Sequence, residues 1–415
     1  MIALIFVRVP VAYSIGISAV VYSFATGSNP VAVIQRSVGS IDSFTLLAVP
    51  LFILVAEIMN EAGLTTILLD AALSWVGHFR GGLSFANVGI NVVFAGLSGS
   101  GVADAAGVGK LLIPQMTRMG YPKGYSAALT ASGAVIGPIL PPSIPFIVYG
   151  LLAQVSVGRL FFAGIAPALM MAAALLIVSF VIAHVRKHPK SGSFSIKRAF
   201  LATWKSIPVL VLPLLIIGGL RGGVFTPTEA AAVAVVYAYV CSFFYTRLSF
   251  AGLVRALKRT ALTTASITII IAFADDVGWL MSVKQIPAAM ASGLLQISHD
   301  PNVILVIIVI FLLIVGVFME SLSAMLIIVP VLAPAVAALG IDPVHFGVIV
   351  VLTLMLGMLT PPVGLVLYVV GAIAKIDAVE VAKANTVFFL ALLVVLAVVM
   401  FAPDVVLAIP RWVMP

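Results

Sequence analysis

Charged side chains are scarce in this chain. Only 9% of its 415 residues are Asp, Glu, Lys or Arg, whereas 63% are hydrophobic, and the mean hydropathy is +1.27. A soluble globular domain has about a quarter of its residues charged, so the composition excludes that class. Nearly uncharged runs recur along the chain, each long enough to cross a hydrocarbon core about 30 Å thick. These runs do not alternate in polarity as membrane strands do, which predicts an all-α integral membrane protein.

Cysteine and histidine are also rare. The single Cys241 excludes an internal disulfide, and no Cys/His cluster has the spacing of a zinc or haem site, so we expect no cofactor and no such metal. The run Gly107-Val-Gly-Lys110 lacks the hydroxyl residue and the leading glycine of a phosphate loop. The net charge of +8 comes from Lys and Arg between apolar runs, which indicates membrane orientation rather than a nucleic-acid partner.

The apolar segments predict the membrane spans. The basic stretches 184–205 and 247–259 are predicted to be cytoplasmic, which places the turn 221–229 on the outer side. Residues 64–79 are too short to span and predict a helix along the interface or an ordinary loop helix packed on its neighbours. The predicted spans are 2–24, 45–60, 84–97, 127–150, 160–183, 206–220, 230–246, 262–283, 303–318, 322–337, 345–372 and 385–408.

The chain matches itself at a constant offset of 220 residues. Over 47 positions, six Gly or Pro identities fall in register, where about one is expected by chance. They pair Gly96 with Gly316, Pro114 with Pro334, Gly120 with Gly340, Gly137 with Gly357, and Pro141-Pro142 with Pro361-Pro362. Five predicted crossings separate the two copies, and an odd number means that they are inverted. Inverted repeats with interrupted helices are typical of secondary transporters.

The first interruption in each copy predicts the tip of a re-entrant hairpin. In the first copy it is the stretch Gly96 to Asp104, where the hydroxyls of Ser98 and Ser100 and free carbonyls suit a hard cation such as Na⁺. Asp104 is an acid within apolar sequence, and Glu320 takes the place of Ser100 in the second copy. The alternatives are small-residue helix packing for the glycines and a structural ion pair or cap for the acids.

The second interruption in each copy predicts a broken helix. The sequences are Gly137-Pro-Ile-Leu-Pro-Pro-Ser143 and Gly357-Met-Leu-Thr-Pro-Pro-Val-Gly364. Adjacent prolines remove donors and leave the preceding carbonyls unpaired, so those carbonyls, with Ser143 and Thr360, suit two related cation sites. A simple kink is the alternative.

Two acidic features lie outside the repeats. Glu229 follows Thr228, which we expect to cap the helix that begins at Glu229, so a structural role competes with one in transport. The pair Asp275-Asp276 lies within a predicted span, and solvation in a cavity or at the interface is our interpretation.

At these residues the chain resembles the large, DctM-like membrane subunit of tripartite ATP-independent periplasmic (TRAP) transporters. The resemblance covers essentially the whole chain and rests on four motifs taken together. The chain departs from the family pattern in two places: the first span is short by several residues, and the pair Asp275-Asp276 is not expected. The four motifs are 96–114, 120–145, Phe225-Thr-Pro-Thr-Glu-Ala-Ala231 and 357–364.

This resemblance implies more than the residues do. It implies an inverted-repeat elevator fold, Na⁺ coupling, import of a small organic acid across the bacterial inner membrane, and no enzymatic activity. It also implies a four-helix, DctQ-like small membrane subunit and a periplasmic substrate-binding protein as partners, with membrane lipid around the chain. The implied parts are scaffold spans and an interfacial helix at 1–83, transport repeats at 84–150 and 303–372, scaffold spans with basic loops at 151–302 and a C-terminal span at 373–415.

The site residues follow from the same resemblance. The positions that match its cation sites are Ser98, Ser100, Ser132, Gly137, Gly316, Glu320, Gly357 and Thr360. Those that match positions important for transport are Asp104, Ser143 and Glu229, with Ser100 as a further candidate at the hairpin tip.

Three other functions are open from the residues alone. A stand-alone ion-coupled organic-anion permease would share the inverted repeat but need no binding protein. A membrane-embedded enzyme would need a catalytic acid, base or metal set, and the acids here are scattered. A purely structural scaffold would have no use for duplicated broken helices, which cost stability.

Overall fold

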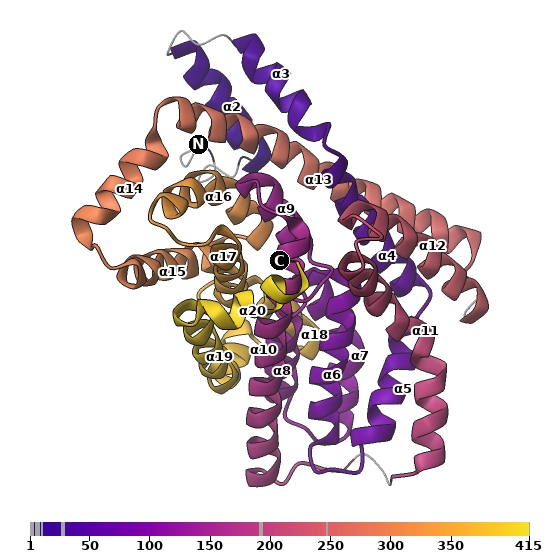
Figure 1. The fold of residues 1–415 in the computed structure, drawn as a ribbon. Coiled ribbons are helices and arrows are strands. Elements are labelled where there is room, and N and C mark those ends of the chain that lie inside the picture. The colour runs from indigo at the N-terminus through magenta and orange to yellow at the C-terminus, as the bar shows by residue number, and fades with distance from the viewer. Residues whose placement is uncertain are drawn as a thin grey trace.

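The computed structural model describes residues 4, 9, 11–25, 30–190, 194–245 and 248–414; within them the side chains of a few residues, Leu97 and Ser98 among these, are not described. All regular elements in this part of the chain are helices, which confirms the predicted class (Figure 1). Seven of these helices are long and apolar enough to cross a membrane. They lie at Phe44–Glu61, Val157–Val185, Ile196–Arg221, Phe250–Val283, Pro301–Phe318, Ser321–Ala338 and Ala378–Phe401.

The N-terminal part contains one helix more than the sequence predicted. The unpredicted helix is α3 (Pro30–Ile41), in which Gln35, Arg36 and Ser37 interrupt the apolar run. The segment 64–79 does form a helix, although its place relative to a membrane stays a prediction. The elements in order are α2 (Val11–Ala25), α3, η1 (Phe44–Leu47), α4 (Ala48–Glu61) and α5 (Leu64–Val76).

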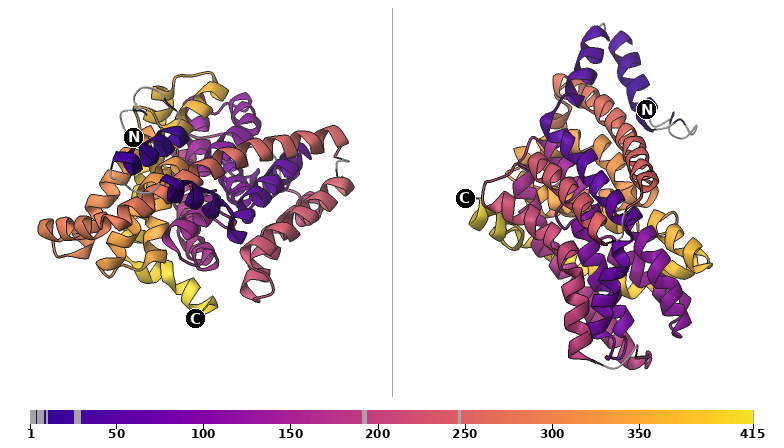
Figure 2. Two further views of the ribbon diagram at one scale, coloured as in Figure 1. Left: turned by 90° about the horizontal axis from the view of Figure 1, so that it is seen from above. Right: turned by 90° about the vertical axis from the view of Figure 1, so that its right-hand side faces the viewer.

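The central helices start earlier than predicted. Ser195 accepts a hydrogen bond from the Arg198 N–H and caps α11 (Ile196–Arg221). Ser249 accepts one from the Gly252 N–H and caps α13 (Phe250–Val283). Most of both basic stretches is therefore helix rather than loop. α13 crosses the molecule as one long helix in contact with α2, α3, α4 and α16 (Figure 2). The other central helices are α10 (Val157–Val185), α12 (Pro227–Tyr245) and the unpredicted α14 (Ile286–Ile297).

The repeat at an offset of 220 residues is visible in the helix bounds. The shift carries α7 (Gly101–Arg118) onto α16 (Ser321–Ala338) residue for residue. Both Pro-Pro peptide bonds, at 141–142 and 361–362, are cis. The remaining pairs are α6 (Gly82–Ser98) with α15 (Pro301–Phe318), α8 (Lys123–Ala134) with α17 (Pro343–Gly357), and α9 (Ile144–Ala153) with α18 (Leu365–Ala374).

The broken helices are observed as predicted. At 1.5 Å per residue, α8, α9, α17 and α18 are each roughly 15 to 23 Å long, so none of them crosses a bilayer alone. In each repeat the two short helices are separated by the Pro-Pro sequence, and together they are long enough to cross.

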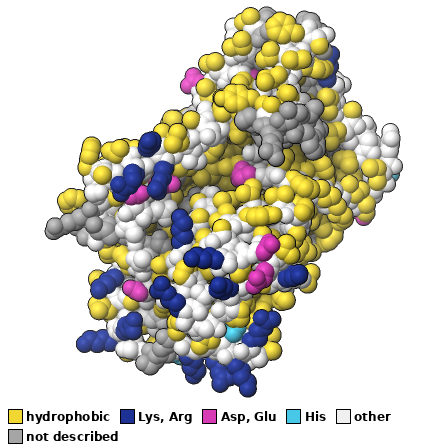
Figure 3. All heavy atoms as spheres, turned by 180° about the vertical axis from the view of Figure 1, so that it is seen from behind, with side chains coloured by type: hydrophobic (Ala, Val, Ile, Leu, Met, Phe, Trp, Pro, Cys, Tyr) yellow, Lys and Arg dark blue, Asp and Glu magenta, His cyan; other side chains and the backbone are white. Residues whose placement is uncertain are grey.

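The equivalent helices α7 and α16 run in opposite directions from the centre of the molecule (Figure 1). After α7 the chain reaches Tyr121, whose hydroxyl donates to the carbonyl of Pro189 in the basic stretch, 3.3 Å away. α16 instead packs against α9. The broken helix α8–α9 begins next to Tyr121 and ends with α9, so α16 lies at its other end. Lys and Arg side chains gather toward one end of the molecule, and the other end is mainly hydrophobic (Figure 3).

The C-terminal segment is not the single span that we predicted over 385–408. α19 (Ala378–Phe401) ends before Pro403, and a separate helix, α20 (Pro403–Val413), begins there. Proline is favoured in the first turn of a helix and disrupts the interior of one, which explains the break. α20 packs against α10.

Candidate functional site

A cavity of about 130 Å³ lies where the two repeats meet. Both hairpin tips, both helix breaks and the two helices α4 and α13 line it, so segments far apart in the sequence converge here. Its lining residues include Gly99 to Ala103 and Glu320 to Leu322 from the tips, Pro138, Ile144, Pro145, Met355 and Met358 from around the breaks, and Glu57, Asn60 and Thr263 from α4 and α13.

The first hairpin tip is held against the break of its own repeat. Gly99 has φ +60°, and a Cβ atom placed on it would lie 2.8 Å from the Pro142 carbonyl oxygen. Ser100 caps α7 by accepting a hydrogen bond from the Ala103 N–H at 3.5 Å. Ser98 is the last residue of α6, and its side chain lies outside the described residues. The tip therefore needs glycine for both its backbone angle and its close approach.

The second tip has the same arrangement with a carboxylate in place of the hydroxyl. Glu320 caps α16 by accepting hydrogen bonds from the N–H groups of Leu322 and Ser323, at 2.9 and 3.2 Å. Its other oxygen accepts from the Ser321 hydroxyl at 2.9 Å. The equivalence of Ser100 and Glu320 is thus one of local structure as well as of sequence, because each is the N-cap of an equivalent helix.

Two glycines bring the second tip onto its break. A Cβ atom on Gly357 would lie 2.6 Å from the Gly316 α-carbon, and the N–H of Gly364 donates to the Val317 carbonyl at 3.3 Å. Contact between two backbones leaves no space for a side chain at either glycine. Gly316 and Gly357 therefore have a packing role, whereas the role in cation binding that was predicted for them stays a prediction.

Asp104 lies directly behind the first tip and is fully buried. A Cβ atom on Gly137 would come within 2.1 Å of its Oδ2 atom, so the carboxylate occupies the space that the missing side chain leaves. The structure thus brings together two residues that the sequence assigned to different sets.

Ser143 connects the two sides of the first break. Its hydroxyl oxygen accepts from the Phe146 N–H at 3.2 Å, which caps α9, and its hydroxyl donates to the Pro138 carbonyl. In the second break, Thr360 donates to the Leu356 carbonyl at 3.1 Å within its own turn. Ser143 therefore stabilises the break itself, and Thr360 does not line the cavity.

Two predicted residues lie elsewhere. The hydroxyl of Ser132 in α8 donates to the side-chain oxygen of Asn385 in α19, 2.6 Å away, and both residues are buried. Glu229 is exposed, and its Oε2 atom accepts from the N–H and hydroxyl of Thr226 at 2.8 and 2.9 Å.

Glu229 and Thr226 form a capping box at the start of α12. We expected Thr228 to be the cap, and that expectation is wrong, because its hydroxyl donates to the Phe44 carbonyl instead. Proline at position 227 marks the first helical residue, so the cap is the residue before it. Glu229 therefore has the structural role that we gave as the alternative, because it caps the start of α12 together with Thr226.

The wall formed by α4 and α13 carries charged groups that the sequence analysis did not single out. Glu61 accepts two hydrogen bonds from Arg255, at 2.9 and 3.2 Å, and Arg259 lies 3.4 Å from Glu57 and 3.2 Å from Glu61. The acids are four residues apart, as are the arginines, so each pair shares one helix face. This spacing could have indicated a charged face on each helix, but not that the two faces meet.

The pair Asp275-Asp276 is also explained. Asp275 lies 3.3 Å from Arg36 of α3, and the hydroxyl of Ser37 donates to buried Asp276. The guanidinium of Arg36 also lies over the Trp279 ring, 5.4 Å from its centroid. Asp275 lines a groove between α3 and α13, whereas Asp276 is buried, so the solvation that we expected for the pair, in a cavity or at the interface, stays a prediction.

The arrangement suits the binding of small ions. The first turns of α7, α9 and α16 all border the cavity, and helix N-termini favour carboxylates and other anions. Glu320, Glu57 and backbone carbonyls at the breaks and tips are oxygen atoms of the kind that hard cations prefer.

The chain is also similar to known proteins over most of its length. The family model "Tripartite ATP-independent periplasmic transporter, DctM component" matches residues 1–405. The chain is similar to the sialic acid TRAP transporter large permease protein SiaM of Vibrio cholerae, with 39% identity over 98% of this chain and 96% of the relative. It is 38% identical to the 2,3-diketo-L-gulonate TRAP transporter large permease protein YiaN of Escherichia coli, over 91% and 89% of the two chains. The fold resembles that of the Alcanivorax borkumensis YdaH transporter, with TM-score 0.64, 16% identity and coverage of 89% and 86%.

Proposed function

Because this chain belongs to the DctM component family of tripartite ATP-independent periplasmic transporters, we propose that it imports a small organic acid by a Na⁺-coupled elevator movement. Membership confirms the family predicted from the motifs. It makes the chain a multi-pass inner-membrane permease subunit and not an enzyme. The stand-alone permease is not retained, since the family is that of a tripartite transporter.

The observation that carries the proposal is the convergence of two tips and two breaks on one cavity. Three helix N-termini there support a carboxylate as substrate, in keeping with the acids named for the two relatives. The N-cap residues Ser100 and Glu320 hold two of those helix ends in place.

Na⁺ is the proposed coupling ion. Glu320 and the carbonyls near Gly137 and Gly357 are the proposed ligand groups, because hard oxygen atoms without nitrogen or sulfur suit an alkali cation. Ser132 and Thr360 are weaker candidates, since they have internal partners and do not line the cavity, and Ser98 stays a candidate from the sequence.

In the proposed movement, residues 84–150 and 303–372 travel together against the rest of the chain. The backbone contacts of Gly99 with Pro142 and of Gly316 with Gly357 join tip and break within each repeat, and α18 packs against α7 and α8, which joins the two repeats. The wall with Glu57 and Glu61 on α4 would belong to the stationary part. We propose a four-helix small subunit and a periplasmic binding protein as partners.

Uptake of labelled organic acids into proteoliposomes tests the proposal. The vesicles contain this chain with its small subunit, and the binding protein and a Na⁺ gradient are each supplied or withheld. Uptake that requires both supports the proposal, whereas uptake of equal rate without the binding protein contradicts it.

A further inference from the structure

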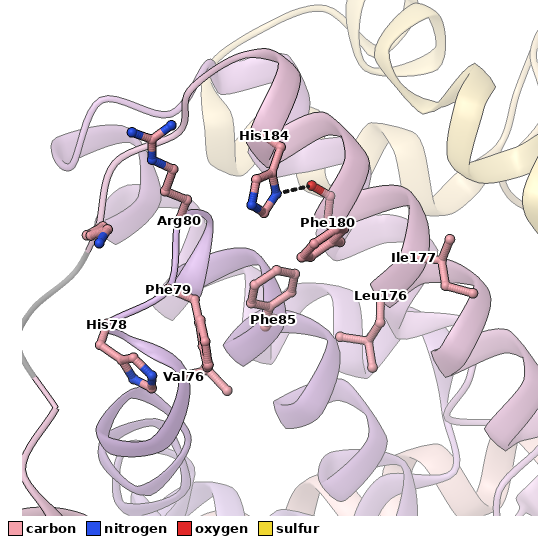
Figure 4. Close-up of a pocket in the computed structure, with 10 residues that line it drawn as sticks. Val76, His78, Phe79, Arg80, Phe85, Leu176, Ile177, Phe180 and His184 are labelled. Carbon is pink, nitrogen blue, oxygen red and sulfur yellow. Dashed lines mark hydrogen bonds between the residues drawn. The ribbon is translucent and has the colours of Figure 1, made fainter.

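A second, larger pocket lies far from the central cavity, at the end of α10 that leads into the basic stretch. Its volume is about 830 Å³, and it is formed by the end of α5, the start of α6 and the last turns of α10 (Figure 4). Its lining residues are Val76, His78, Phe79, Arg80, Phe85, Leu176, Ile177, Phe180, His184 and Lys190.

One part of the pocket is a wall of apolar side chains. Phe85 of α6 faces Leu176 and Phe180 of α10, with Phe85 and Phe180 stacked at a centroid distance of 6.4 Å (Figure 4). Ile177 and Phe180 are 65% and 55% exposed, so the wall is open at the surface of the molecule. An exposed apolar surface of this kind on a membrane helix suits contact with acyl chains.

The other part is a cationic rim that the fold holds in place. The Pro189 carbonyl accepts from the Gly81 N–H and from the Tyr121 hydroxyl, both at 3.3 Å. This joins two loops and places Arg80 and Lys190, the neighbours of the bonded residues, on the same rim.

Two further contacts fix the rim to α10. Gly81 has φ +78° and approaches Ala183 so closely that a Cβ atom would lie 2.4 Å from the Ala183 methyl carbon. The Nδ1–H of His184 donates to the Phe180 carbonyl at 2.9 Å, which orients the ring at the edge of the apolar wall (Figure 4).

The chemistry of the pocket fits one ligand class. Cationic groups beside an apolar wall match a phosphate attached to an acyl chain, and none of the lining residues is acidic. A small soluble anion would make no use of Phe85, Ile177 and Phe180. Since the basic stretches are predicted to lie on the cytoplasmic side, we place the pocket at the leaflet whose surface carries anionic lipid.

We propose that this pocket is a binding site for an anionic phospholipid of the cytoplasmic leaflet. Arg80 and Lys190 bind the phosphate, and the first part of an acyl chain lies along Ile177 and Phe180. The site is separate from the transport cavity, and it does not depend on the proposed substrate or coupling ion.

The test is a lipid titration of the purified full-length chain in detergent, followed by native mass spectrometry. Phosphatidylglycerol and phosphatidylcholine with identical acyl chains are compared, and soluble glycerol phosphate is the competitor. The variant is Arg80→Gln with Lys190→Gln. The control is Lys197→Gln with Arg198→Gln, which removes the same charge from the same end of the protein, at residues that do not line the pocket.

We expect phosphatidylglycerol to bind on the order of tenfold more tightly than phosphatidylcholine. The Arg80/Lys190 variant should lose that preference and the control should keep it. Equal loss in both variants would show general charge attraction and overturn the proposal. Glycerol phosphate that competes equally well at equimolar concentration would also overturn it, because the apolar wall would then contribute nothing to the affinity.

Discussion

The carboxylate of Asp104 occupies the space beside the α-carbon of Gly137, where a methyl group would come within 2.1 Å of its Oδ2 atom. This contact joins the first hairpin to the first helix break. It explains why an acid and a glycine 33 positions apart belong to one structural unit.

Replacing Gly137 with alanine should destabilise the protein by about 1–3 kcal/mol, because the new methyl group forces Asp104 or the break to move. The matched control is Gly89→Ala in α6, where a Cβ atom meets nothing within 4 Å and helix propensity improves. Thermal unfolding of the purified chain measures both. The double variant Asp104→Ala with Gly137→Ala should recover stability but not transport, and equal behaviour of the two glycine variants would contradict the contact.

Gly316→Ala and Gly357→Ala should lower the stability of the protein more than Gly137→Ala does. Each methyl group meets backbone atoms of the other segment, and backbone cannot rotate away as a carboxylate can. Yield and melting temperature in detergent are the measurements, with Gly293→Ala in α14 as the unobstructed control. If the two variants melted like that control, the close approach of α15 and α17 would be wrong.

Glu320→Gln separates capping from cation binding. The amide oxygen can still accept from Leu322 and Ser323, so the fold should be kept. We expect the Na⁺ concentration for half-maximal uptake to rise roughly tenfold, because a ligand charge is lost. Glu320→Ala should lower stability as well, by about 1 kcal/mol. An unchanged Na⁺ dependence in Glu320→Gln would restrict this residue to capping.

Thr226→Ala and Glu229→Ala should destabilise the start of α12 and show non-additivity when combined, because both remove the same capping box. Thermal unfolding of the single and double variants measures this coupling. Uptake by the same variants is measured in parallel, so that a loss of transport can be compared with the loss of stability. Loss of uptake that exceeds the loss of stability in Glu229→Ala alone would assign this exposed carboxylate a second role.

His188 gives the protein a predicted sensitivity to mild acid. Burial, together with nearby Arg186, lowers the pKa of this imidazole below its ordinary value of 6.5. The unfolded chain therefore takes up a proton first as the pH falls, and stability decreases below about pH 6.5 but is unaffected above it. His188→Gln should reduce the difference in melting temperature between pH 7.5 and pH 5.5. A larger difference would contradict the sign.

The repeat and its interruptions were predictable because glycine and proline act on the backbone at their own positions. Gly99, Gly137 and the Pro-Pro pairs therefore indicated tips and breaks directly. The cap of α12 was also readable, since Thr226 precedes Pro227 and lies three residues before Glu229.

Contacts that depend on how helices pack were not predictable. Nothing local relates Glu61 to Arg255 or Asp275 to Arg36, because the register of α13 against α3 and α4 sets those pairs. The partner of Ser132 is equally distant, in α19. α3 was missed because its polar residues interrupt the hydrophobic run that marks a helix in this chain.

The central claim is that the cavity between the repeats is the transport site. Ala103 faces this cavity, and the single native Cys241 is buried in α12, so Ala103→Cys in a Cys241→Ala background provides one accessible thiol. Ala337→Cys, on the exposed far part of α16, is the control. Labelling by a membrane-impermeant thiol reagent is measured in proteoliposomes with and without Na⁺ and the transported acid. The account predicts that both together slow labelling at position 103 and leave position 337 unchanged. Equal labelling of position 103 under all conditions would contradict it.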